Sequence, residues 1–216
     1  MAINSYAGLK DAVRRWSKRK DATDAFIDDF ISLAEEEIYS NPVSPLRIKE
    51  MDTRATATVS ITERFLALPD RFLEMRRFKI NAQTSTTPGF ANDNDIRFRA
   101  PDQLLLNSIS GAPGFFSVTS QIGFERIPDQ LYVVEMQYFS KELPLSDTNT
   151  SNAVLTNYPS IYLNGALWAL WQYYSEEEKA EYYHTKMVDG ISGANRAEKR
   201  SRYGNAPQIH KERNYP

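Results

Sequence analysis

The chain has 216 residues, and its 26 lysine and arginine side chains against 28 aspartate and glutamate side chains give a net charge of −2. Hydrophobic residues make up 41% of it, enough for the core of one domain, or of one domain with an insertion. The chain contains no cysteine, which excludes disulfides, thiol nucleophiles and cysteine-based metal sites. The charge balance excludes a nucleic-acid-binding protein whose whole surface is basic.

The apolar runs are short, the longest being residues 166–171, whereas a membrane-spanning helix needs about 20 apolar residues. The first residues lack the basic start and apolar stretch of a signal peptide. We therefore expect a soluble protein of cytoplasmic origin with no membrane partner.

Two helices are predicted in the N-terminal quarter. Ser5 is an N-cap candidate for the first helix, in which Leu9, Val13 and Trp16 recur at helical spacing. Thr23 is the corresponding candidate for the second. The apolar stripe of that second helix consists of Ile27, Phe30, Ala34 and Ile38, and its acidic residues, among them Asp28, Asp29 and Glu35, lie largely off the stripe.

From about residue 52 the hydrophobic period changes to two, which is typical of half-buried strands. Residues 54–60 and 64–68 are predicted to be two β-strands joined by a turn. A short helix is predicted over residues 101–110. Further strands are expected at about 71–80, 115–119, 122–126 and 131–138. Five or six short antiparallel arms would form a sheet or a small barrel.

Helix returns near Pro159, with a stripe of Leu163, Leu167, Leu170 and Tyr174, and with further large apolar side chains on its other sides. A helix that is apolar nearly all round must be covered nearly all round. One interpretation is the central helix of an ordinary core. The other, which we favour here, is a helix buried partly by a neighbouring subunit at Trp168, Trp171 and Tyr174.

A further helix is predicted to begin at a bend, because Ser175 and Glu178 have the spacing of a capping box. From Arg196 onward the chain carries six lysines and arginines and two glutamates, a charge of +4 that leaves −6 for residues 1–195. The expected class is therefore α+β, with N- and C-terminal helices packed together. Its predicted parts are a helical domain of residues 1–49 and 153–200, an antiparallel β insertion of residues 50–142 and an extended basic tail of residues 201–216.

Catalytic motifs are missing from the sequence. His184 and His210 have no partner at metal-ligand spacing, and there is no nucleophile elbow or glycine-rich phosphate loop. We therefore expect no enzyme, no cofactor and no metal. Basic clusters at residues 14–20 and in the tail keep a nucleic-acid-binding accessory protein open as the alternative function.

Several segments, in collinear order, resemble a family of tailed-phage head-to-tail adaptor proteins. The resemblance covers about residues 5–204, and its motifs are structural rather than catalytic. It is carried by residues 5–10 (Ser-Tyr-Ala-Gly-Leu-Lys), 26–35, 47–56, 68–77 (which begin Leu-Pro-Asp-Arg-Phe-Leu-Glu), 145–147, 155–159, 162–167 and 202–204.

The resemblance implies a ring, usually twelve-fold, that lies under the portal protein and carries the tail or nozzle protein below it. It implies a virion protein of the head–tail junction, assembled in the host cytoplasm, through whose ring double-stranded DNA passes without being gripped. An acidic or neutral channel wall is then expected, with Asp28, Asp29 and Glu35 as candidates. The expected portal-docking residues are Arg196, Arg200, Arg202, Tyr203, Ile209, His210 and Tyr215.

Overall fold

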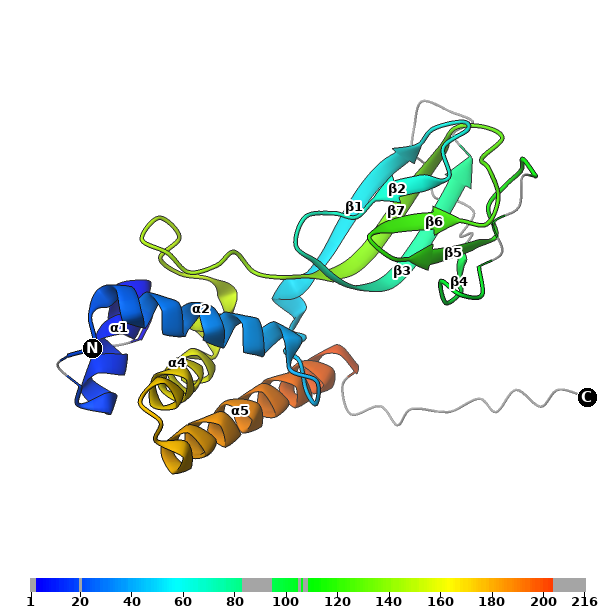
Figure 1. Ribbon diagram of the computed structural model, residues 1–216. Coiled ribbons are helices and arrows are strands. Elements are labelled where there is room, and N and C mark those ends of the chain that lie inside the picture. The colour runs from blue at the N-terminus through cyan, green and yellow to red at the C-terminus, as the bar shows by residue number, and fades with distance from the viewer. Residues whose placement is uncertain (1–2, 20, 83–94, 105, 107–108, 204–216) are drawn as a thin grey trace, which may run out of the picture. The chain divides into compact units, whose positions relative to one another are not determined.

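The computed structural model describes residues 3–19, 21–82, 95–104, 106 and 109–203 (Figure 1). The chain divides into two compact units, one of residues 1–49 and 142–216 and one of residues 50–141. The described secondary structure of the first unit consists of α-helices, and the second unit carries the strands. The predicted α+β class is confirmed.

The helical unit consists of α1 (Tyr6–Ser17), α2 (Asp24–Ser40), α3 (Ala153–Asn157), α4 (Pro159–Tyr173) and α5 (Glu177–Tyr203). Both predicted N-caps of the first two helices are confirmed. The Ser5 side chain accepts a hydrogen bond from the Gly8 N–H at 3.2 Å, and the Thr23 side chain accepts one from the Phe26 N–H at 3.5 Å. Within the described residues, no helix is both long and apolar enough to span a membrane.

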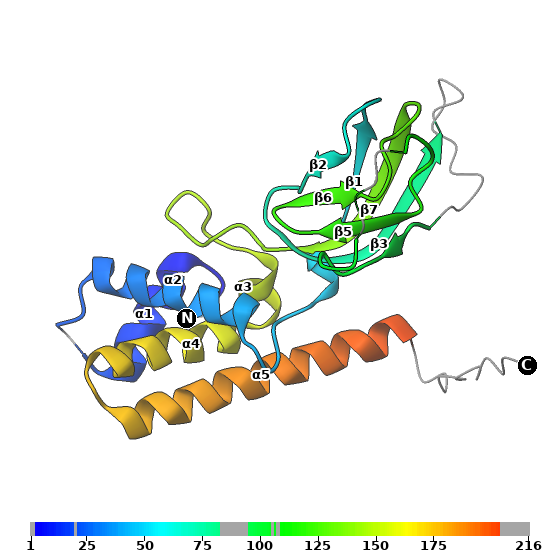
Figure 2. The same ribbon diagram turned by 45° about the vertical axis from the view of Figure 1, so that its right-hand side comes forward.

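Helix α4 lies between α2 and α5 in both views of the molecule (Figures 1 and 2). The three helices approach closely at Gly165 because this residue has no side chain. A Cβ atom there would lie 2.8 Å from the Cβ of Ala34 on α2 and 2.9 Å from the Sδ of Met187 on α5. The predicted stripe of α2 is buried along its length, which follows from this packing.

The structure adds two details to the predicted helices. Trp16 does not belong to the buried stripe of α1, since 56% of it is exposed while Leu9 and Val13 are buried. Ser175 does not cap α5 but ends α4, because its φ of 56° is left-handed and its N–H donates to the Gln172 carbonyl at 3.0 Å. The next N–H, of Glu176, donates to the Trp171 carbonyl at 3.0 Å, which completes a Schellman turn.

The β unit forms two sheets rather than a closed barrel. One sheet has the order β1-β7-β3 and the other β2-β6-β5-β4. The short helical turn η1 (Lys49–Met51) leads into β1. The strands are β1 (Asp52–Val59), β2 (Phe65–Ala67), β3 (Phe72–Ala82), β4 (Arg97–Phe98), β5 (Phe115–Val118), β6 (Gln121–Phe124) and β7 (Tyr132–Ser140).

One apolar core joins the two sheets, built from side chains of both. At its centre the Phe78 ring of β3 lies 4.8 Å from the Phe116 ring of β5 and 6.0 Å from the Phe124 ring of β6, measured between centroids. The pairing is antiparallel except for β4 and β5, which run parallel.

Two expectations for the β unit are wrong. The arms at residues 54–60 and 64–68 do not pair with each other, because β1 pairs with β7 and β2 pairs with β6. The helix expected over residues 101–110 is replaced, in its described part, by a turn that is closed by the Ala100 carbonyl. Ile109, which would face inward on the expected helix, is exposed, and its carbonyl accepts the Ile127 N–H at 3.2 Å, so the backbone is engaged in strand-like pairing.

Candidate interaction surfaces

The aromatic residues at the end of α4 all have partners within their own chain. Trp171 is only 7% exposed and lies beneath the ammonium group of Lys179, 4.3 Å from the ring centroid. The Trp168 ring lies 5.2 Å from the His184 ring, and the Tyr174 hydroxyl donates to Asp21 at 2.8 Å. Because the chain's own helices cover α4, its apolar circumference no longer argues for a subunit boundary at these residues, and that boundary stays a prediction.

The acidic residues of α2 do not form one surface. Asp28 faces α1, where its carboxylate accepts the Tyr6 hydroxyl at 2.6 Å and lies 3.2 Å from the Lys10 ammonium group. Glu35 is half-buried and faces the interior of the helical unit. Among the three candidates for a channel lining, only Asp29 has an exposed side chain.

Glu35 belongs to a polar network that the sequence analysis did not anticipate. Its Oε1 accepts the Tyr162 hydroxyl at 2.9 Å and the Leu145 N–H at 2.9 Å. The Asn152 amide donates to the same hydroxyl at 2.7 Å, and the Asn152 oxygen caps α3 by accepting the Leu155 N–H. The network ties the loop before α3 to α2 and α4.

Burial raises the pKa of Glu35, because desolvation penalises the carboxylate more than its two hydrogen bonds favour it. Burial also raises the pKa of the Tyr162 hydroxyl, so both groups hold their protons more tightly than they would in water. This arrangement is suited to fixing a loop.

The last turns of α5 carry an exposed cationic face, formed by Arg196, Lys199 and Arg200. Glu198 points the other way and is buried, and its carboxylate accepts the Lys49 N–H and the Tyr158 hydroxyl, each at 3.3 Å. The helix is thereby anchored with its cations turned outward.

Helix α5 continues through Tyr203, so the extended tail expected from residue 201 begins no earlier than residue 204. Arg202 and Tyr203 therefore lie on the helix. Ile209, His210 and Tyr215 lie outside the described residues.

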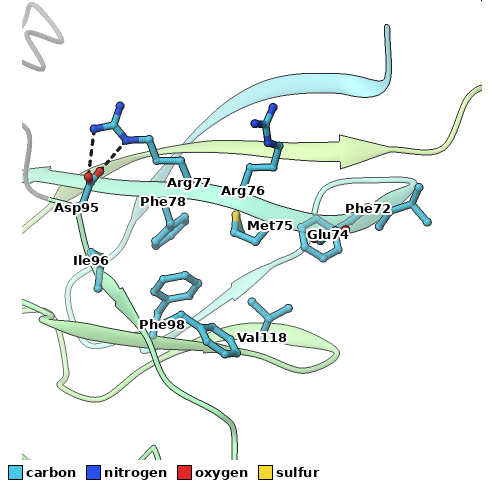
Figure 3. Close-up of a pocket in the computed structure, with 12 residues that line it drawn as sticks. Phe72, Glu74, Met75, Arg76, Arg77, Phe78, Asp95, Ile96, Phe98 and Val118 are labelled. Atoms are coloured by element: carbon cyan, nitrogen blue, oxygen red, sulfur yellow. Dashed lines mark hydrogen bonds and ion pairs between the residues drawn. The ribbon is translucent and has the colours of Figure 1, made fainter. Parts of the chain in front are cut away.

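A groove of about 500 Å³ lies in the β unit, between β3 and the strands β4 and β5 (Figure 3). Phe78, Met75 and Phe98 turn towards it, while Arg76 and Arg77 point away. The Arg77 guanidinium forms two hydrogen bonds with Asp95, at 2.9 and 3.1 Å. The lining is therefore apolar, with its charges paired at the rim, and it suits an apolar side chain better than a reacting substrate.

The described residues contain no group of three or more histidine and carboxylate side chains that could hold a metal ion. His184 is engaged structurally, because its Nε2 lies 3.1 Å from a Glu37 carboxylate oxygen and its ring packs on Trp168. This pair links α5 to α2. His210 lies outside the described residues.

A comparison with protein families places residues 4–210 on the model described as SU10 adaptor protein. The match runs from before α1 to beyond α5 and so includes both units. A search of curated proteins found no match. The family match therefore covers the cationic end of α5 and the β-unit groove alike.

Proposed function

The chain belongs to the SU10 adaptor protein family of phage structural proteins, and from this premise we propose that it is the connector between the head and the tail of the virion. Copies of the chain form a ring, with twelve subunits in the family that it resembles. The portal protein lies above the ring and a tail or nozzle protein below it. The ring assembles in the host cytoplasm and becomes part of the head–tail junction.

The observation that carries the proposal is the extent of the family match, which includes both the helical and the β unit rather than one module. A connector needs surfaces and no reaction centre. The network around Glu35 and the His184–Glu37 pair join elements of the helical unit, and the apolar groove of the β unit offers a contact surface.

Packaged DNA passes through the ring without being gripped, because phosphates held by many lysines and arginines would resist ejection. Of the three acidic residues of α2 considered for the wall, Asp28 and Glu35 already face partners in their own chain, and Asp29 is exposed and open to contacts outside it.

Docking to the portal uses the end of α5 and the residues that follow it. Arg196, Lys199 and Arg200 form an exposed cationic face directly before residues 204–216, which add two basic side chains and one acidic one. Such a segment suits an acidic groove on the portal.

Co-sedimentation with the portal protein of the same phage tests this function. A chain that ends at Tyr203 should lose binding, and Arg200→Glu should weaken it in a salt-dependent way. Arg97→Glu, the same charge change at an exposed cation of the β unit, is the matched control and should bind normally. If the folded full chain does not bind portal but retains double-stranded DNA in low salt, the accessory nucleic-acid protein is the better account.

A further inference from the structure

Two exposed surfaces of the helical unit have complementary chemistry. We name the first the Trp16 surface, and it consists of Arg15, Trp16, Lys18, Lys179 and Tyr182. We name the second the α2 stripe, and it consists of Phe26, Asp29, Leu33 and Glu36.

The Trp16 surface surrounds a hollow of about 470 Å³ between the end of α1, Trp171 of α4 and the start of α5. Trp16 is 56% exposed and Tyr182 is 57% exposed, so two large rings stand at its edge in water. Exposed aromatic side chains around a hollow are typical of a contact surface, where they supply most of the binding free energy. Lys18, the residue that follows α1, adds a cation, and the ammonium group of Lys179 on α5 adds a second one, which lies 3.3 Å from a Glu176 carboxylate oxygen.

The α2 stripe is the exposed row of α2, and its first residue touches α4, where the Phe26 ring lies 5.7 Å from the Tyr173 ring between centroids. Its four residues are spaced by three, four and three positions, which places them on one side of the helix. Leu33 is 49% exposed and Phe26 is 40% exposed, and the carboxylates of Asp29 and Glu36 lie in the same row. A helix with apolar anchors seven residues apart, one acidic residue between them and a second one after them, fits an apolar hollow with a cationic rim.

The two surfaces lie on different sides of the unit. Helix α4 lies between α2 and α5 in both views (Figures 1 and 2), and the residues that line the hollow include none from α2. One copy therefore cannot bring its own stripe to its own hollow. A contact between different patches of successive copies is heterologous, and a heterologous contact can close into a ring.

We infer that the α2 stripe of one copy docks on the Trp16 surface of the next copy, with Leu33 entering the hollow between Trp16 and Tyr182. Asp29 and Glu36 then face the cations at the end of α1, Arg15 and Lys18. The inference rests on the proposed ring, because it names the interface through which that ring closes. It replaces Trp168, Trp171 and Tyr174 as the centre of the subunit boundary, and it places Asp29 in that boundary rather than on the channel wall.

Cross-linking tests the contact directly, since the chain has no cysteine of its own. The variant Leu33→Cys/Tyr182→Cys, assembled with portal and treated with a short bis-maleimide, should give a ladder of covalent oligomers. A mixture of the two single variants should stop at dimers, because each copy then carries only one half of the contact. Val43→Cys/Tyr182→Cys is the control with an equally accessible cysteine and should give no ladder.

Charge exchange gives a second measurement that separates this inference from the proposed function. Lys18→Glu and Glu36→Lys should each reduce ring formation at least tenfold, and the double variant should recover most of it. If wild type forms rings on portal while the cross-link and the exchange both fail, the inference is wrong and the function stands. If wild type binds no portal and forms no ring, the proposed function fails, and this interface fails with it.

Discussion

The helical unit and the β unit bury different kinds of polar groups. In the helical unit Lys10 and Glu198 are buried charged residues, each with an oppositely charged or hydrogen-bonding partner. In the described part of the β unit the buried polar residues are Ser117 and Ser140, and the core is aromatic and aliphatic. Polar contacts thus select the arrangement of the helices, while apolar packing holds the two sheets together. Polar and apolar substitutions should therefore act differently in the two units.

The largest effect is expected from Trp171→Asp. This change places a carboxylate where a buried ring now fills the space between α4 and α5, so the free energy of unfolding of the helical unit should fall by about 4 kcal/mol or more. Hydrogen exchange of α4 and α5 measures it. Trp16→Asp, at an exposed tryptophan, should change stability by only about 0.5 kcal/mol. A stable Trp171→Asp monomer would mean that α4 is not the core of the unit.

Phe78→Ala is the equivalent change in the β unit. It removes the ring that contacts both Phe116 and Phe124, and should cost about 3–5 kcal/mol. Amide exchange should accelerate in β6 and β7 and remain unchanged in α4. Phe98→Ala, at an exposed ring near the same groove, should cost about 1 kcal/mol. Equal acceleration in both units would show that the two cores do not unfold separately.

Gly165→Leu tests the close approach of the helices. The new side chain would overlap Ala34 and Met187, and the overpacking should cost about 3 kcal/mol, measured by urea denaturation. Gly193→Ala on α5 is the matched control, because nothing lies within 4 Å of the position of its added Cβ. That variant should be more stable than wild type by about 0.5–1 kcal/mol. Tolerance of leucine at position 165 would contradict the packing of α2 on α4.

Tyr162→Phe removes only a hydroxyl, but it leaves Glu35 and Asn152 without one of their buried partners. The cost should be about 1–3 kcal/mol. Tyr182→Phe, at an exposed hydroxyl, should change the free energy of unfolding by no more than about 0.5 kcal/mol. Chemical denaturation of the two variants compares them, and equal effects would argue against a network that specifies the helical unit.

Glu35→Gln should act through pH. Burial raises the pKa of Glu35 in the folded state, so its contribution to stability is fully present below the unfolded-state pKa near 4.5 and is lost as the pH rises through the folded-state value. The variant does not titrate, and its stability relative to wild type should therefore rise between pH 4 and pH 7. Thermal melts at both pH values measure this, with the exposed Glu36→Gln as control. A constant difference from wild type would contradict the raised pKa.

The sequence predicts those features that depend on neighbours along the chain. Ser5 and Thr23 identify helix starts because an N-cap acts within three residues, and alternation identifies β7 because a strand alternates wherever it lies. Alternation does not say which strand is the partner. Residues 54–60 and 64–68 therefore looked like a hairpin, whereas β1 pairs with a strand that begins at Tyr132.

The interaction surfaces were less accessible to prediction, because they depend on residues far apart in the chain. The Tyr162–Glu35 hydrogen bond joins residues 127 positions apart, and no local pattern marks either of them. Trp16 fitted the helical spacing of a buried stripe, but spacing alone does not say where the stripe ends. The cationic residues of the C-terminal region were visible in the sequence, since a run of like charges needs no partner to be recognised.

Electron microscopy of the wild-type chain mixed with its portal protein tests the central claim most directly. The account predicts an additional ring of density below the portal, coaxial with its channel, whose subunits contact one another through their helical units. A portal that stays bare in the presence of excess folded chain, or that binds isolated copies without forming a ring, would contradict it.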